Sequence, residues 1–127
     1  KLGMPPEETA AVITAIGNHD EETAYPVNEL AAALILADKS DVRRSRVRSK
    51  DTIAFDIHDR VNYAVERSAL KLDKEAKTIT LELEIDSSIC PILEYFEIFM
   101  TRMLLCRKAA AFFDLRFGIV INGQIMM

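Results

Sequence analysis

The spacing of apolar residues changes near Ala69, and this change restricts the folds that the chain can adopt. Before Ala69 apolar residues recur every three or four positions, as in helices, and after it they alternate with polar residues, as in half-buried strands. Helices followed by strands, without regular alternation, favour the α+β class. We therefore predict a helical segment over residues 1–68 and an α+β portion over residues 69–127, joined in one compact unit.

Three helices are predicted in the first part. Prolines and acidic residues at positions 5–8 favour a helix start, and Gly17 favours a helix end. A second helix begins after Pro26, and a third covers Asp51 to Arg67. The residues of the third helix that we expect to face inward are Ile57, Val61, Ala64 and Val65.

The second part predicts a small antiparallel sheet packed on one long helix. A polar turn at residues 73–77 separates two alternating runs, which is the pattern of a hairpin with one buried face. The apolar residues of these runs are Leu70 and Leu72, then Ile79, Leu81, Leu83 and Ile85. A long helix follows Pro91, and residues 117–121 form a further strand that turns at Asn122 and Gly123 into residues 124–127.

The long helix has an apolar surface wider than one stripe, so we expect it to be covered on more than one side. Charged residues interrupt its apolar run, which argues against a membrane span. These residues are Glu94, Glu97, Arg102, Arg107 and Lys108. Besides completing the core, such a helix could join two copies in a homodimer or help to sense a small ligand.

The composition excludes several classes of partner. The net charge is −4, and charges of both signs are mixed along the chain. Both features argue against a nucleic-acid-binding arm and against a membrane-surface module. RNA binding by the basic run from Arg43 to Lys50 is disfavoured, because no aromatic residues are interleaved for base stacking. Cys90 and Cys106 have neither metal-ligand nor disulfide-framework spacing, so we expect a cytoplasmic protein with reduced thiols.

Candidate site residues occur between the first helix and the end of the second. His19 and Asp20 lie in the loop after the first helix. The predicted inward stripe of the second helix contains Asp38 among Val27, Leu30, Ala31, Leu34 and Val42. A buried carboxylate requires a partner, so Asp38 would face a cation, a metal or a polar network. Alternatively, the helix reaches solvent at this residue.

Two short segments of this region resemble a known superfamily. AIGNHDE and LADKSD, separated by a short polar gap that ends in Pro26, look like the second half of the HD-domain metal-dependent phosphohydrolases. The resemblance extends from about Val12 to Val42. It implies that Asp38 is a metal ligand and that His19 binds a second metal or contacts phosphate.

The same resemblance implies a reaction. A divalent ion such as Mg or Mn would activate water for attack on a small phosphorylated substrate, which is a phosphomonoester or a nucleotide. Arg43 or Arg44 would neutralise the charge that develops on the phosphate, and Asp20 would orient His19 or act as a base. Without the resemblance, His19 is an exposed loop histidine, and the arginines form a solvated connector or ion pairs.

The chain departs from the family pattern in its metal ligands. Members carry a histidine and an adjacent His-Asp pair on earlier helices, whereas only four residues precede Pro5 here. With two histidines in all, a site built by this chain alone would rely on carboxylates. We therefore expect the C-terminal part of a larger enzyme, or else a non-catalytic regulatory or dimerisation module on the same scaffold. His58 is expected to have a structural role.

Overall fold

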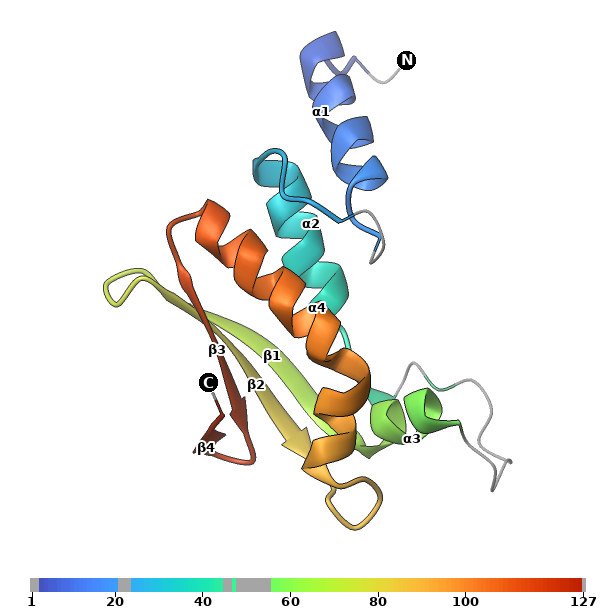
Figure 1. The fold of residues 1–127 in the computed structure, drawn as a ribbon. Coiled ribbons are helices and arrows are strands. Elements are labelled where there is room, and N and C mark those ends of the chain that lie inside the picture. The colour runs from blue at the N-terminus through green and yellow to red at the C-terminus, as the bar shows by residue number, and fades with distance from the viewer. Residues whose placement is uncertain (1–2, 21–23, 45–46, 48–55, 127) are drawn as a thin grey trace.

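A computed structural model of the chain describes residues 3–20, 24–44, 47 and 56–126. The helices are α1 (Pro6–Gly17), α2 (Glu29–Ser40), α3 (Ile57–Ala64) and α4 (Ile92–Phe112). The strands are β1 (Val65–Asp73), β2 (Thr78–Ile85), β3 (Arg116–Ile121) and β4 (Gln124–Ile125). The predicted α+β class is confirmed (Figure 1).

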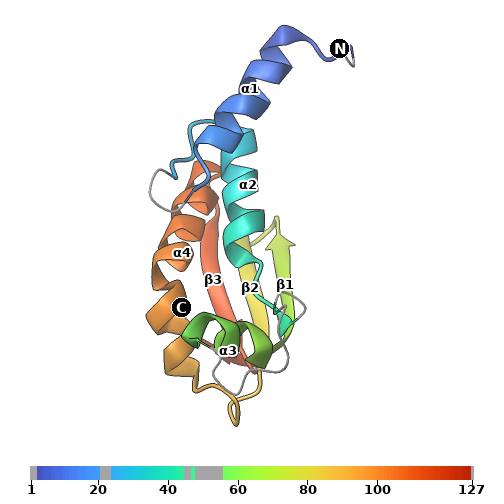
Figure 2. The same ribbon diagram turned by 90° about the vertical axis from the view of Figure 1, so that its right-hand side faces the viewer.

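The elements form two layers. Helices α2 and α4 lie side by side over one face of the sheet, while α1 extends beyond one end of α2 and α3 lies near the opposite end of the layer (Figure 2). The other face of the sheet carries polar side chains, among them the ion pairs Arg67–Glu84 at 3.7 Å and Lys71–Glu82 at 3.2 Å. No helix among the described residues has the length and apolarity that crossing a membrane requires.

The sheet is mixed, with the strand order β1-β2-β3-β4. The pairs β1–β2 and β3–β4 are antiparallel, as predicted, but the central pair β2–β3 is parallel, with Leu81 opposite Ile119. The expectation of an antiparallel sheet is therefore wrong for this pair. The physical reason lies in α4, because parallel neighbours need a long crossover, and this helix carries the chain back to the starting end of β2.

Most predicted helices are confirmed, but the third is shorter than expected. α3 begins at Ile57, where the Asp56 side chain accepts a hydrogen bond from the Asp59 amide at 2.8 Å and so caps the helix. Positions 51–55 of the predicted helix lie outside the described residues. Residues 65–67 belong to β1, because Val65 pairs with Ile85 in the sheet and this pairing outweighs local helix propensity. The predicted boundary after residue 68 thus falls inside β1.

One hydrophobic core joins the sheet to the helices above it. Its largest fully buried side chains include Tyr95, Ile35, Leu81, Met103 and Ile119. Both cysteines are free thiols buried in this core. α4 is covered on its inner sides, but its outer face keeps a row of exposed apolar residues. That row consists of Leu93, Met100 and Leu104.

The hairpin formed by β1 and β2 is buried less evenly than its sequence pattern predicts. Leu81 and Leu83 on β2 are buried, whereas Leu70 and Leu72 on β1 are 36% and 54% exposed. The register places Leu70 opposite Leu81 and Leu72 opposite Ile79, so all of these side chains share the face that carries the helices. The expected burial of β1 is therefore wrong, because β1 is an edge strand and α2 covers its apolar side only in part.

Candidate functional site

The buried face of α2 is rotated relative to the predicted stripe. The buried residues are Ala31, Ala32, Ile35, Leu36, Lys39 and Ser40. Leu30, which belongs to the predicted stripe, is 46% exposed, and Asp38 lies at the edge of the buried face. Ala31 and Val42 of the predicted stripe are buried, but the prediction was wrong for Leu30 and Asp38, because α2 is apolar on almost every side and packing against α4 selects which side is buried.

Lys39, and not Asp38, is therefore the deeply buried charged residue of α2. The Lys39 side chain is 7% exposed, and the Asp38 side chain is 41% exposed. The Lys39 ammonium donates a hydrogen bond to Asp38 Oδ2 at 2.7 Å. Asp38 thus has a cationic partner, which is one of the alternatives that the sequence left open, and the partner is its immediate neighbour in the chain.

Charges from three elements act on the Asp38 carboxylate. Burial acts to raise its pKa, but the hydrogen bond from Lys39 and the Lys39 charge outweigh burial. The positive charge of Arg102 on α4, and that of His19 when protonated, lower the same pKa further. The pKa of Asp38 consequently lies below its ordinary value, and the carboxylate is ionised at neutral pH.

His19 lies just beyond the end of α1, as predicted. Its Nδ1 contacts the carbonyl oxygen of Ile16, which fixes the ring against the last turn of the helix. Because a carbonyl can only accept, Nδ1 carries the proton, and in the neutral ring Nε2 has a free lone pair. Nε2 is 3.7 Å from Asp20 Oδ1, and the His19 side chain is 26% exposed. His19 is thus held in an orientation that leaves one nitrogen available for a ligand.

Sequence reasoning missed Lys39 and Arg102. Lys39 follows Ile35 by four positions and Leu36 by three, so helical spacing could have placed it on the buried face. Arg102 follows Phe99 by three positions and lies over the Phe99 ring, 4.8 Å from its centroid. An arginine three positions after a phenylalanine, on a helix face that also carries large apolar residues, is the signal that could have identified Arg102.

The two arginines proposed as phosphate contacts bind elsewhere in the described part of the chain. Arg43 Nε is 3.1 Å from Asp41 Oδ1. Arg44 Nε donates to the Tyr63 carbonyl oxygen at 2.7 Å, and its guanidinium lies 4.4 Å from the centroid of the Tyr63 ring. The contacts of Arg44 connect the segment after α2 to α3. A role for either arginine in phosphate binding remains a prediction.

The remaining predicted residues are less constrained. The Asp20 side chain is 79% exposed, so its proposed action as a base or as a support for His19 remains a prediction. His58 is exposed and packs edge-on against Phe99, with ring centroids 6.3 Å apart, which agrees with a structural role. Beyond Arg44, the basic residues at positions 46, 48 and 50 lie outside the described residues.

The described residues do not provide a self-contained metal site. No group of three or more histidine, cysteine, aspartate or glutamate side chains is placed to hold an ion within the described ranges. His19 offers one nitrogen and Asp38 offers a carboxylate, but one Asp38 oxygen already accepts from Lys39. A catalytic divalent ion usually has three protein ligands, so this pair alone does not fit one.

The structure therefore brings together a carboxylate and basic side chains from three separate elements. We call Asp38, Lys39, His19 and Arg102 the basic cluster. Its excess of positive groups suits an anion better than a bare cation. No family model matches this chain, and comparison with curated proteins and with solved structures finds no match either.

Proposed function

We propose that this chain binds the phosphate group of a phosphomonoester or nucleotide at the basic cluster, as part of a phosphohydrolase of the HD type. The observation that carries the proposal is that His19, beyond the end of α1, and Arg102 on α4 both lie close enough to Asp38 for their charges to lower its pKa. A phosphate dianion would gain a bidentate partner in Arg102 and a hydrogen-bond donor in protonated His19. The resemblance of residues 12–42 to the HD superfamily supports the same substrate class.

Within this proposal, each residue has a limited and testable task. Lys39 keeps Asp38 ionised and fixes its carboxylate at the edge of α2. Asp38 in turn presents a negative charge to the basic side chains around it. Arg102 adds a permanently charged guanidinium from α4. The arrangement recognises a phosphate without any step that depends on a metal.

A divalent metal such as Mg or Mn belongs to the proposal only as a further requirement. It would require the neutral form of His19, with Nε2 as a ligand in place of the protonated contact to phosphate, and further ligands besides His19 and Asp38, since the described residues hold no group of three donors. We also propose a cytoplasmic location, which the two free, buried thiols favour.

Calorimetric titration with adenosine monophosphate and with inorganic phosphate tests the proposal, in parallel with phosphate release in the presence of Mn²⁺. His19→Gln and Arg102→Met should each weaken binding about tenfold, as expected for loss of one charge-assisted contact. Arg107→Met, an exposed arginine on the same helix, is the matched control and should bind normally. Binding that is equal in all four proteins, or absent in the wild type, contradicts the proposal. Binding without hydrolysis favours the non-catalytic alternative.

A second candidate function is a non-catalytic dimerisation module. The observation that favours it is the exposed apolar row on α4, in which Leu93 is 76% exposed and Met100 is 42% exposed. Two copies could bury these rows against each other. Sedimentation velocity should then show a dimer that Leu104→Glu dissociates. Ile125→Glu, which changes an 82% exposed residue on β4, is the control and should leave the dimer intact.

A further inference from the structure

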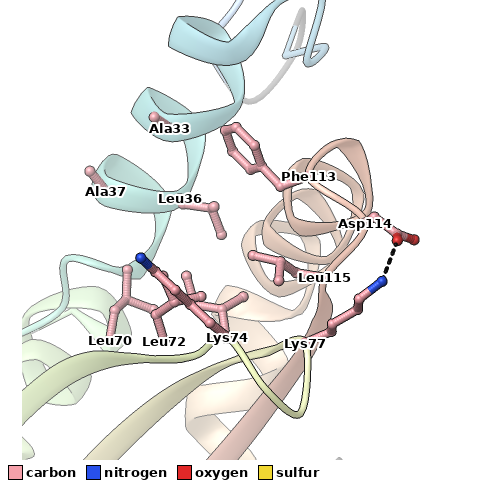
Figure 3. A pocket seen from close by; sticks show the side chains of 11 residues that line it. Ala33, Leu36, Ala37, Leu70, Leu72, Lys74, Lys77, Phe113, Asp114 and Leu115 are labelled. Atoms are coloured by element: carbon pink, nitrogen blue, oxygen red, sulfur yellow. Dashed lines mark hydrogen bonds and ion pairs between the residues drawn. The ribbon is translucent and has the colours of Figure 1, made fainter.

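A separate apolar pocket opens between α2, the β1–β2 hairpin and the end of α4 (Figure 3). Its volume is about 600 Å³, which is within the range of small-molecule sites. Its apolar walls are formed by Ala33, Leu36, Ala37, Leu70, Leu72, Ile79, Phe113 and Leu115. None of the residues of the basic cluster lines this pocket.

The pocket lies where the edge of the core is left uncovered. Leu70 and Leu72 point to the helix-bearing face of the sheet, yet both remain substantially exposed. The facing positions on α2 are Ala33 and Ala37, whose side chains are too short to cover them. Exposed leucine surface on the core side is unfavourable by about 25 cal/mol per Å², so an apolar ligand that covers it gains free energy.

The charge at the pocket indicates which apolar ligand fits. Lys74 and Lys77, both from the turn between β1 and β2, lie at its border. Lys77 is paired with Asp114 at 3.3 Å, whereas Lys74 has no carboxylate within ion-pair distance among the residues that the structure describes. In Figure 3, the Lys74 side chain extends over Leu70 and Leu72 toward α2, while Lys77 points to Asp114. The pocket thus offers apolar walls and one uncompensated ammonium.

We propose that this pocket binds an amphiphilic carboxylate, with its hydrocarbon part against Leu70 and Leu72 and its carboxylate on the Lys74 ammonium. This arrangement satisfies both features of the site at once. An uncharged hydrocarbon would leave Lys74 without a partner, and a small hydrophilic anion would leave the leucines exposed. A medium-chain fatty acid has both parts in the required order.

Titration of the full chain with decanoate, followed by amide chemical shifts, tests this proposal below the concentration at which decanoate forms micelles. Decanol and butyrate are the matched probes, because the first lacks the charge and the second lacks the chain. We expect saturable shifts at Leu72, Ala37 and Leu115, with decanoate bound about fivefold more tightly than decanol. Absence of saturable shifts, or equal affinity for decanoate and decanol, overturns the proposal.

Variants separate the two parts of the site. Lys74→Met should abolish the preference for decanoate over decanol, whereas Lys108→Met, an exposed lysine on α4, should retain it. Ala37→Phe should weaken both ligands about tenfold by filling the pocket. Ala33→Phe is a second blocking variant, and Ala10→Phe on α1 is the control for adding an exposed phenylalanine to a helix.

Sedimentation of the same proteins distinguishes a ligand from a second copy of the chain. If Ala37→Phe converts a dimer to a monomer while decanoate binding is unchanged, the occupant is another protein molecule and the proposal is wrong. Loss of decanoate binding with unchanged sedimentation supports it. Neither result depends on phosphate binding at the basic cluster, so the two proposals can fail independently.

Discussion

Asp38→Asn should destabilise the protein by removing the counter-charge of a buried ammonium. Lys39 is 7% exposed and depends on Asp38 for its hydrogen bond at 2.7 Å. Breaking a fully buried ion pair in this way costs about 3–5 kcal/mol. The Asp38 side chain is 41% exposed, so water replaces part of the lost interaction. We therefore expect the free energy of unfolding to fall by about 1–2 kcal/mol.

Removing the Lys39 ammonium instead of the Asp38 carboxylate should destabilise the protein less. Lys39→Met places an apolar side chain in the buried position and leaves Asp38 partly hydrated, so the expected loss is about 0.5 kcal/mol or less. The double variant should resemble Lys39→Met alone, because its asparagine no longer faces an unpaired ammonium. The double-mutant cycle should then give a coupling free energy of about 1–2 kcal/mol.

Urea unfolding, followed by circular dichroism, measures all four proteins of this cycle. Asp114→Asn is a suitable control, because Asp114 is 90% exposed in its pair with Lys77 and should contribute nothing measurable. If Asp38→Asn is as stable as the wild type, or if the two single effects simply add, then Asp38 does not neutralise Lys39 and the electrostatic account of the basic cluster is incorrect.

Three further predictions concern other interactions. Asn122 has a φ of 51°, and its side chain accepts from the Ile85 amide at 2.8 Å and donates to the Ile85 carbonyl at 3.0 Å. Asn122→Ala should therefore lower the free energy of unfolding, measured with urea, by about 2–3 kcal/mol. Asn122→Gly loses the same hydrogen bonds but tolerates positive φ, so if Asn122→Ala destabilises the protein no more than Asn122→Gly does, the cost assigned to positive φ is contradicted. Glu94→Gln should weaken the two-point contact with Arg60, at 3.0 Å for both bonds, and lower the urea midpoint by less than Asn122→Ala does. The pKa of Asp38 is lowered from 3.8, so the stability that its carboxylate contributes is complete above that pH and is lost as the pH falls through the folded-state pKa. Acid titration of Asp38→Asn should therefore show a shallower loss of stability than that of the wild type.

Much of the fold was predictable because local signals and tertiary packing agree. The proline and acidic start of α1, and the turn after β3, are specified by residues whose backbone preferences match their positions. The end of α3 was not predictable, since Val65 can continue a helix or begin a strand. Its pairing with Ile85 comes from a residue 20 positions later in the chain.

The candidate site was predictable only in part. A histidine after a helix end and an aspartate on the next helix can be recognised in the sequence. The structure places His19 close enough to Asp38 for a positive charge on the ring to lower the pKa of the Asp38 carboxyl. The role of Arg102 was not predictable, because it requires α4 to pack beside α2. The spacing of Lys39 from Ile35 and Leu36 is compatible with its burial, but α2 is apolar on nearly all sides, so spacing alone does not select that face over the others.

The sequence by itself determined the order of helices and strands, the α+β class and the position of His19 just beyond α1, since these depend on short-range backbone preferences and on the period of apolar residues. Only the tertiary structure decided that β2 and β3 are parallel, that Lys39 is buried beside Asp38, and that an apolar pocket opens next to Lys74. These features arise when segments distant in sequence exclude water together, and such long-range packing is not encoded in any single stretch of the chain.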